Sequence, residues 1–253
     1  MMTPFFKSHY SIGKSILTLE EEGASVEDGP QSIIDLCKRS KMKDLFLIDD
    51  SMSGFLQGYL NCKNAGLNFR FGLRISVCED LREKNEDQLK KTSKVILFAK
   101  NKEGYKRLIK IYTQAAQHGF YYVPRTDYKN LKSFWSNEDL RLVVPFYDSF
   151  LHLNALNGHL CMPDFSFCDP LYAVESNDIP FNYLISKRVQ EYCNQDKCLD
   201  VKSIFYSSKE DFKAFLTFKC INNRSTLDKP NLDHMTSDEF SFESWVDQTR
   251  KAA

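Results

Sequence analysis

The sequence has no excess of charge, no long apolar run and no closely paired cysteines, and each absence excludes a class of protein. The 34 basic and 34 acidic side chains among 253 residues leave no net charge, so the composition does not indicate a polyanion-binding protein. No apolar run reaches the length of a membrane span, which excludes a transmembrane role. The eight cysteines form no CxxC pair and no signal peptide is recognisable, so we expect free thiols in a reducing cytoplasm.

The clearest pattern in the sequence lies between Lys94 and Leu131. Val95–Ala99 is an apolar run of strand length, which predicts a buried parallel strand leading into a helix. Gly119 ends that helix, and Asp127 is the predicted N-cap of the next one. Apolar residues at spacings of three and four predict the helix face that packs on a sheet: Tyr105, Leu108, Ile109, Tyr112, Ala115 and Ala116.

The remaining sequence alternates between strand-like and helix-like segments. Such repetition predicts an α/β fold, with a parallel sheet closed or nearly closed into a barrel and helices outside. We place the barrel in residues 1–221 and a C-terminal loop with a terminal helix in residues 222–253. Cys78–Ser93 is predicted to be a loop. Further predicted strands are 45–48, 69–77, 140–147, 171–174 and 204–206, and further predicted helices are 31–41, 55–65, 181–192, one around 212–216, and 239–251.

Two motifs within the stretch Lys94–Leu131 carry a family resemblance. They are AKNxEGYKxL at residues 99–108 and GFYYxPRxD at residues 119–127. In this order they resemble the N-terminal domain of bacterial replicative DNA polymerase III α subunits, which are C-family polymerases. That domain belongs to the PHP (polymerase and histidinol phosphatase) superfamily. The resemblance extends over roughly residues 4–220 and implies a distorted seven-stranded (β/α) barrel of the PHP type.

The resemblance also implies where a metal site would lie. An active PHP domain holds a cluster of divalent ions, which activates a bound water for attack on a phosphate ester. His9 and Asp178 match familiar ligands and would hold manganese, zinc or magnesium if a site persists. The matched positions should face one cavity, because they follow the C-terminal ends of barrel strands. They are His9, Asp50, Arg74, Lys94 (or Lys100), Asp148 and Asp178.

Most matched positions have lost the family's ligand type. The substituted positions are Lys7, Ser11, Asp50, Arg74, Lys94, Asp148 and Pro180. Arg74 replaces a carboxylate, so a fixed cation stands where an anion would bind the metal. Burial of that cation would require ion pairing, and we expect Arg74 to lie between Asp50 and Asp148. The sequence therefore predicts a degenerate metal site.

The resemblance implies a PHP-like domain of a DNA polymerase III α-type protein. With these substitutions, we expect it to be a non-catalytic scaffold or partner-binding module in DNA replication, without a cofactor. The expected partners are polymerase domains or replication proteins such as a proofreading exonuclease, with DNA contact as a further expectation. The alternative is a metal-dependent phosphoesterase or 3′–5′ exonuclease with a rewired site at His9, Asp50, Asp148 and Asp178. The sequence does not decide whether this chain is an enzyme.

Other motifs have simpler interpretations. Gly13-Lys14-Ser15 ends like a phosphate-binding loop, but Ser8 stands where that motif requires a glycine. The segment His159–Cys168 and the residues Cys193 and Cys198 lack the repeated spacing of a zinc site, which favours free thiols.

The aromatic residues 120–122 admit two interpretations. They could stack on nucleobases, but their position between a helix end and a proline favours a core and hinge role. The Lys- and Arg-rich span Arg82–Lys110 fits a solvated face better than a nucleic-acid groove. His118 is expected to interact with the helix C-terminus, and His152 and His234 have no assignable partner in the sequence.

Overall fold

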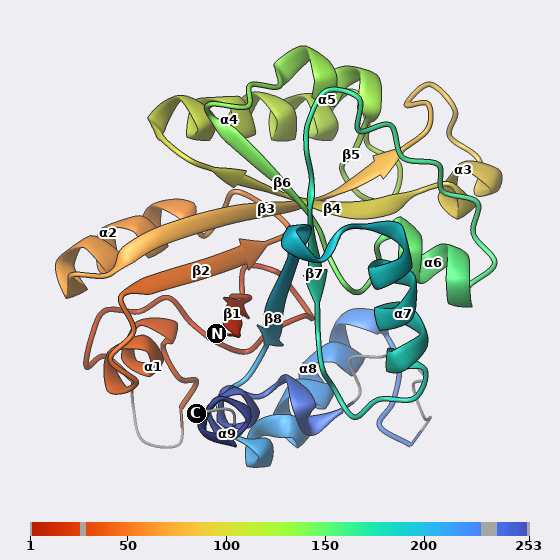
Figure 1. The fold of residues 1–253 in the computed structure, drawn as a ribbon. Coiled ribbons are helices and arrows are strands. Elements are labelled where there is room, and N and C mark those ends of the chain that lie inside the picture. Colours follow the sequence, from red (N-terminus) through yellow and green to blue (C-terminus); the bar gives the residue numbers. More distant parts are fainter. Residues whose placement is uncertain (1, 26–28, 229–236, 252–253) are drawn as a thin grey trace. The chain divides into compact units, whose positions relative to one another are not determined.

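The computed structural model describes residues 2–25, 29–228 and 237–251. The chain divides into two compact units, and the elements of both are labelled in Figure 1. Strands β3 (Asn68–Cys78) and β8 (Cys198–Ile204) contribute residues to both, because the unit boundaries fall within them. Unit 1 comprises Met1–Phe71, Ser176–Ile179 and Val201–Ala253, and unit 2 comprises Gly72–Glu175 and Pro180–Asp200.

Unit 1 contains both termini of the chain and a group of parallel strands. Strand β1 pairs in parallel with β2 on one side and with the end of β8 on the other. Besides parts of β3 and β8, the elements of unit 1 are β1 (Thr3–Phe6), α1 (Ile33–Arg39), β2 (Asp44–Asp49), α2 (Phe55–Ala65), α8 (Phe212–Asn223) and α9 (Phe242–Lys251).

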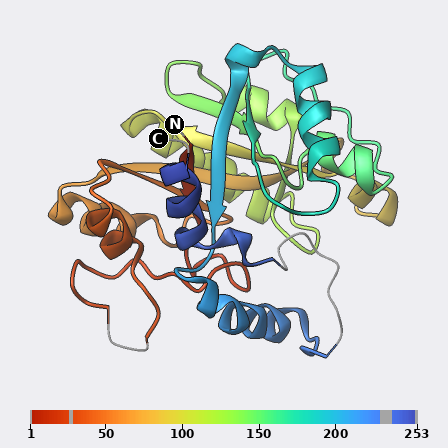
Figure 2. The ribbon, with the colours of Figure 1, turned by 60° about the horizontal axis from the view of Figure 1, so that its bottom comes forward.

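The core of unit 1 joins the N-terminal strand to the C-terminal helix. Trp245 of α9 donates its indole N–H to the carbonyl of Met2 at 3.1 Å, and the rings of Phe242 and Phe6 lie 5.8 Å apart. Figure 2 shows α9, in dark blue, beside the start of the chain. The terminal helix predicted at residues 239–251 is therefore present and packs on β1, while the domain boundary after residue 221 stays a prediction.

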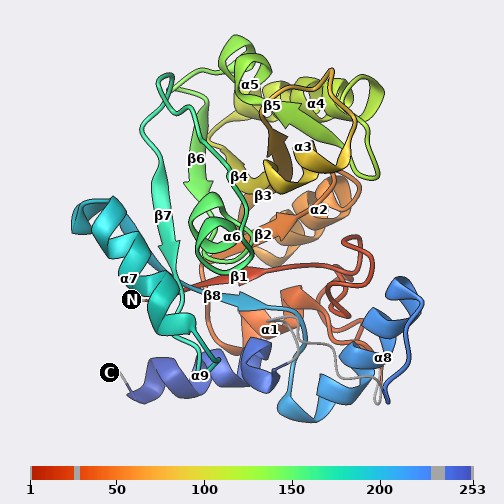
Figure 3. The same ribbon diagram turned by 90° about the vertical axis from the view of Figure 1, so that its right-hand side faces the viewer.

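Unit 2 combines parallel and antiparallel strands. Strand β6 pairs in parallel with β7, and the two run side by side in Figure 3. Its elements, besides parts of β3 and β8, are α3 (Glu86–Lys90), β4 (Ser93–Ala99), α4 (Lys102–Gln117), β5 (Arg125–Asp127), α5 (Tyr128–Phe134), β6 (Leu140–Val144), α6 (Phe150–Leu156), β7 (Leu171–Val174) and α7 (Asn182–Tyr192).

Strand β4 corrects the sequence prediction, because it is antiparallel to both of its neighbours. Leu97 faces Leu73 of β3 on one side and Leu142 of β6 on the other. The apolar run predicted a parallel strand because a strand buried on both faces looks the same in either direction. Cys78–Ser93 was also predicted wrongly as a loop throughout, since α3 forms within it, capped by the Asn85 side chain.

The strand order nevertheless confirms the predicted fold class. Hydrogen-bonded neighbours follow the order β2-β1-β8-β7-β6-β4-β3-β5, and β2 also pairs with β3. Seven strands therefore form a closed sequence of pairings, and β5 adds to β3. This is the strand connectivity of a distorted α/β barrel.

Two glycines in the motif region are required by close backbone contacts. A Cβ on Gly104 would lie 2.2 Å from the carbonyl oxygen of Asp139, and one on Gly119 would lie 1.9 Å from that of Arg125. Neither distance is compatible with a larger residue. The glycines thus let the first turn of α4 and the chain just after α4 approach the neighbouring backbone.

Some predicted helix faces differ from the observed ones. In α4 the buried residues are Gly104, Leu108, Ile111 and Ala115, whereas Ile109 is exposed. In α7 the apolar spacing predicts an inward face of Phe181, Leu184, Ile185 and Tyr192. Ile185 is buried as predicted, whereas Phe181 and Tyr192 are exposed and Val189 is buried in addition. A spacing rule finds the helix, but neighbouring elements decide the width and centre of its buried face.

Candidate functional site

In unit 1, Asp50 follows β2 and contacts two lysines. The Nζ of Lys7 donates to its Oδ1 at 3.0 Å, and the Nζ of Lys14 donates to its Oδ2 at 2.5 Å. The Lys7 side chain is only 4% exposed, whereas that of Lys14 is 36% exposed. Both oxygens of this carboxylate therefore accept hydrogen bonds from ammonium groups.

The neighbouring Asp49 is buried and holds the chain between β1 and the following loop. Its carboxylate accepts hydrogen bonds from the Ser8 N–H at 2.9 Å, the Ser8 hydroxyl at 2.6 Å and the Ser11 hydroxyl at 2.8 Å. Burial raises the pKa of Asp49, although the charge of Lys7 and these hydrogen bonds oppose the rise. The sequence assigned Asp49 no role, because burial is not visible in a pair of adjacent aspartates.

His9 lies in the same loop but contacts mainly backbone and a neighbouring ring. Its Nδ1 is 3.3 Å from the carbonyl oxygen of Leu17, and its ring lies 4.3 Å from that of Tyr10. Ser15 of the GKS sequence donates to the carbonyl of Phe205 at 2.8 Å. With Lys14 bonded to Asp50, the GKS residues serve internal contacts, as the missing glycine predicted.

Asp178, the other matched aspartate of unit 1, is exposed, and the residue beside it is buried. Asn177 accepts a hydrogen bond from Lys202, a fully buried cation that also donates to Glu239 at 2.8 Å. Sequence reasoning missed Lys202 because a single lysine in a strand reads as solvent-facing. Lys202 lies between Val201 and Ser203 in the strand, and this order of residues does not indicate that the lysine faces inward.

In unit 2, Arg74 and Asp148 form the expected ion pair. Nη2 of Arg74 donates to Oδ2 of Asp148, with side chains 6% and 31% exposed. Asp148 lies after β6 with a positive φ of 61°, a conformation that aspartate tolerates better than most residues. The pairing of Arg74 with Asp50 stays a prediction.

The antiparallel direction of β4 brings Lys94 to the same end of the sheet. The backbone N–H of Lys94 donates to the carbonyl of Asp148 at 2.8 Å, and Lys94 pairs with Ser76 in β3. Lys100 lies at the opposite end of β4, where its Nζ donates to the carbonyl of Asn137 at 2.7 Å. Of the two alternatives, Lys94 is therefore the residue near Asp148.

His152 also belongs to this cluster, and the sequence assigned it no partner. The Nδ1 atom of His152 accepts a hydrogen bond from the backbone N–H of Asp148 at 2.9 Å. The backbone N–H of His152 donates to the Ser149 hydroxyl. Because Nδ1 accepts, the ring is neutral in this arrangement, with its proton on Nε2. The order Asp-Ser-x-x-His, with serine as N-cap of α6, was the available signal.

The predicted residues thus fall into two groups. His9, Asp50 and Asp178 belong to unit 1, and Arg74, Lys94 and Asp148 belong to unit 2. Their convergence on one cavity stays a prediction. Over the ranges that the structure describes, no group of three or more His, Cys, Asp or Glu side chains is placed to hold a metal ion. His234 lies outside the described residues.

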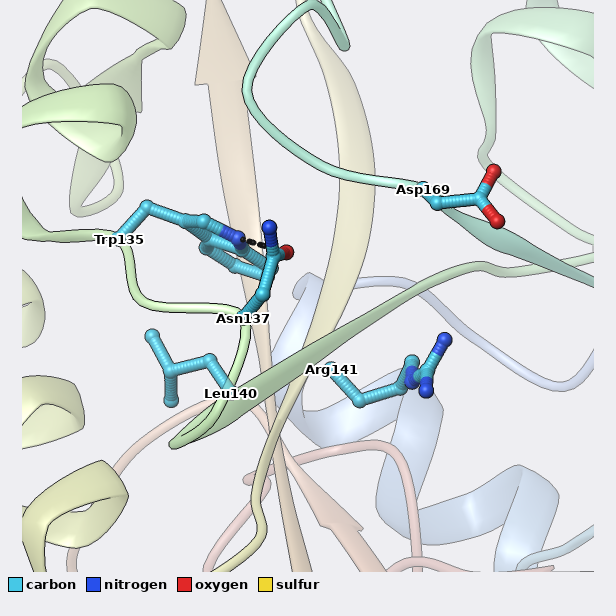
Figure 4. Close-up of a pocket in the computed structure, with 5 residues that line it drawn as sticks. All are labelled: Trp135, Asn137, Leu140, Arg141 and Asp169. Carbon is cyan, nitrogen blue, oxygen red and sulfur yellow. Dashed lines mark hydrogen bonds between the residues drawn. The ribbon is translucent and has the colours of Figure 1, made fainter.

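A pocket of about 230 Å³ lies elsewhere in unit 2 and contains none of the matched positions. Figure 4 shows the Trp135 indole bonded to Asn137, at 2.8 Å, with Arg141 and Asp169 on the other side. Asp169 accepts a hydrogen bond from Lys197 at 2.5 Å. The pocket therefore shares no residue with the predicted site.

Comparison with known proteins identifies the family. The model of the PHP domain matches residues 23–164, which is more than half of the chain. The chain belongs to the PHP domain family. The fold and both motif regions of this PHP domain agree with that assignment.

Curated relatives are subunits of a DNA polymerase. DNA polymerase III subunit alpha of Borreliella burgdorferi is 31% identical over 116 residues, which are 44% of this chain and 10% of that protein. The subunit of Helicobacter pylori is 34% identical over 112 residues, 43% of this chain and 9% of that protein. That of Aquifex aeolicus is 25% identical over 222 residues, 80% of this chain and 19% of that protein.

This PHP domain is therefore homologous to part of these subunits, and the match spans less than a fifth of each relative's length.

The aromatic turn after α4 is exposed, which corrects its predicted core role, while the predicted hinge role stays a prediction. Phe120 is 52% and Tyr122 75% exposed, and Tyr122 has a positive φ of 61°. In the same turn the buried Arg125 lies 5.1 Å from the Tyr121 ring centre and donates to the carbonyl of Gly119 at 3.2 Å. The turn thus exposes the rings of Phe120 and Tyr122 to solvent, while the ring of Tyr121 contacts the guanidinium of the buried Arg125.

Within the described ranges, none of the helices is both long and apolar enough to cross a membrane.

Proposed function

We propose that this PHP domain is a non-catalytic scaffold or partner-binding module of a DNA polymerase III α-type protein, acting in DNA replication in the cytoplasm. The observation that carries the proposal is the occupation of the matched carboxylates by cations. Asp50 accepts from Lys7 and Lys14, and Asp148 accepts from Arg74. The cations supply fixed positive charge of the kind that a metal cluster would provide.

The donor atoms support the absence of a working metal cluster. A divalent ion requires free carboxylate or imidazole lone pairs. Both oxygens of Asp50 accept hydrogen bonds from ammonium groups, and a second matched position carries the guanidinium of Arg74, which has no lone pair to offer a metal. The arrangement as it stands does not fit the metal site that the family resemblance implies, so we derive no hydrolytic step through one.

The test combines metal analysis with a nuclease assay. The purified chain is dialysed against manganese, zinc or magnesium and analysed for bound metal, and 3′–5′ degradation of labelled single-stranded DNA is then measured. We expect no metal retained at stoichiometric level and no degradation above that of an Asp178→Asn variant purified in parallel. Metal-dependent degradation that is lost in Asp178→Asn would establish instead a nuclease using His9, Asp50, Asp148 and Asp178.

A reciprocal variant sharpens this test. Lys7→His, Asp50→His and Arg74→Glu together introduce the two histidines and the carboxylate that the family resemblance implies at these three matched positions. We expect the triple variant to bind more divalent metal than the wild type in equilibrium dialysis. A matched Lys7→Met, Asp50→Asn and Arg74→Met variant removes the same charges without adding ligands and should show no gain.

The partner-binding part of the proposal is supported by exposed apolar side chains. Phe120 and Tyr122 project from unit 2, and Leu56 and Leu60 lie on the exposed side of α2 in unit 1. Exposed aromatic residues are common anchors of protein interfaces. The expected partners are polymerase domains or a proofreading exonuclease subunit, and the aromatic turn is also suited to DNA contact by base stacking.

Binding measurements with a double variant test this surface. Phe120→Ala with Tyr122→Ala should weaken capture of the polymerase fragment or exonuclease subunit by at least about tenfold, as interface aromatics commonly do. Leu160→Ala with Met162→Ala is the matched control, because both side chains are also highly exposed in unit 2. Unchanged capture in both variants would exclude the turn, and loss only of oligonucleotide binding would assign it to DNA.

A further inference from the structure

Two cysteine thiols in unit 2 are in direct contact. Cys193 follows the last residue of α7, and Cys198 is the first residue of β8. Their Sγ atoms are 3.3 Å apart and share a hydrogen bond. A single turn of 3₁₀ helix at Gln195–Lys197 folds the intervening chain so that the two side chains meet.

This pair differs from the other cysteines. All eight cysteines are free thiols, and among the described residues this is the only hydrogen bond between two of them. Both are partly exposed, whereas Cys37, Cys62 and Cys161 are buried. The pair is thus both accessible and preassembled, which are the two requirements for thiol–disulfide exchange.

We propose that Cys193 and Cys198 are a redox-active dithiol that forms a reversible intramolecular disulfide by exchange with small-molecule disulfides such as oxidised glutathione. A disulfide requires a sulfur separation of about 2.05 Å, so the Sγ atoms must approach by little more than 1 Å. The segment between them contains only four residues and a partly exposed 3₁₀ turn, which can accommodate that movement.

The exchange has two balanced steps. One thiol loses its proton to solvent and attacks the small disulfide, forming a mixed disulfide and releasing one small thiolate. The second thiol then loses its proton and attacks the protein sulfur of the mixed disulfide, releasing the second small thiolate. The two protein thiols are oxidised by two electrons, the small disulfide is reduced by two, and the released thiolates take up the two protons.

The surroundings indicate which cysteine reacts first. Burial raises the pKa of Cys193 to about 12, and its hydrogen bond to Cys198 adds to the rise. The Sγ of Cys193 also donates to the carbonyl of Val189 at 3.2 Å, whereas that of Cys198 makes a longer contact of 3.7 Å with the carbonyl of Asn194. Cys198 is therefore the entering thiol, and Cys193 is the one that resolves the mixed disulfide.

The new bond would tie the end of α7 to the start of β8. Cys198 pairs with Tyr172 in β7, so the link joins a helix end to the sheet of unit 2. Oxidation would therefore fix the position of the end of α7 against that sheet.

The experiment uses the full chain, folded, at neutral pH. It is incubated with oxidised glutathione, free thiols are alkylated, and the products are identified by intact mass and peptide mapping. We expect a Cys193–Cys198 disulfide without adduct, reversed by dithiothreitol. Cys193→Ser cannot form this disulfide and should instead accumulate one glutathione on Cys198. Circular dichroism establishes that each variant is folded.

Cys168→Ser and Cys220→Ser are matched controls, because both cysteines are partly exposed and neither contacts another thiol in the described chain. The disulfide should form in both at the wild-type rate. Wild-type protein that carries glutathione on both Cys193 and Cys198, or that forms a disulfide between other cysteines, would overturn the proposal.

Discussion

The two carboxylates at matched ligand positions, Asp50 in unit 1 and Asp148 in unit 2, are neutralised in different ways. Asp50 forms ion pairs with two lysines, of which Lys7 is buried and Lys14 is partly exposed. Asp148 pairs with one buried arginine, has a left-handed backbone conformation and is fixed from behind by His152. Both carboxylates form ion pairs, but Asp50 has two cationic partners, whereas Asp148 has one and a left-handed backbone conformation.

This difference indicates how each centre should respond to mutation. A buried cation that loses its anion incurs the cost of desolvation without compensation. An exposed cation that loses its anion regains water and loses little. The burial of the cation, more than the number of ion pairs, should therefore rank the effects.

The largest effect is expected for Asp50→Ala, which removes the carboxylate from the buried ammonium of Lys7. We expect the free energy of unfolding to fall by about 3 kcal/mol in urea denaturation, as for other broken buried pairs. Asp44→Ala is the control, since Asp44 pairs with the exposed Arg70 at 3.3 Å and should cost less than about 1 kcal/mol. Equal losses in the two variants would show that burial of Lys7 is not decisive.

Asp148→Ala should follow, with a loss of about 2 kcal/mol, because the carboxylate itself is partly exposed. Asp148→Asn removes the same charge but tolerates the left-handed conformation. It should be less damaging by about 1 kcal/mol, the usual difference for a side chain at positive φ. If alanine and asparagine cost the same by denaturation, the backbone geometry of this centre contributes nothing.

The pH dependence of the free energy of unfolding should show the raised pKa of Asp49. Because burial raises the pKa of Asp49, the native state keeps its proton to higher pH than the unfolded chain does. The stability contributed by this group is therefore fully present below the unfolded pKa of about 3.9 and is lost as pH rises through the folded value.

Asp49→Asn removes this titration and retains a side chain that can bond to Ser8 and Ser11. The free energy of unfolding of the wild type minus that of Asp49→Asn should fall as pH rises from about 4. Urea denaturation at a series of pH values measures this difference. A difference that rises with pH would contradict the assignment.

The smallest effect is expected for Lys14→Ala. The Lys14 side chain is 36% exposed, and Asp50 keeps its contact with Lys7. The loss should be about 0.5 kcal/mol at low salt and vanish in 1 M sodium chloride, where exposed charges are screened. A salt-independent loss would mean that Lys14 acts through packing and not through its charge.

Local elements were largely predictable from the sequence. Helix α2 begins and ends at the predicted residues, with Gly66 at a positive φ of 71° after its last residue. Asp127 caps α5 by accepting from the N–H of Asn130 at 2.7 Å, as expected. These features depend on interactions within a few residues, which a sequence displays directly.

The direction of β4 and the burial of Lys202 were not predictable in this way. Both depend on partners distant in sequence: Leu97 is flanked by Leu73 and Leu142, and Lys202 is satisfied by Glu239. An apolar run carries no information on strand direction, and an isolated lysine gives no sign of a buried acceptor.

By itself the sequence indicated the family, the α/β class and most element positions, because these follow from motifs and local periodicity. The loss of the family's metal ligands stays a prediction. Only the tertiary structure decided that Lys7 and Lys14 share Asp50, that Arg74 pairs with Asp148, and that Lys94 rather than Lys100 lies at that end of the sheet. The physical reason is that ion pairing and strand direction are set by groups brought together from distant parts of the chain, whose energies depend on burial.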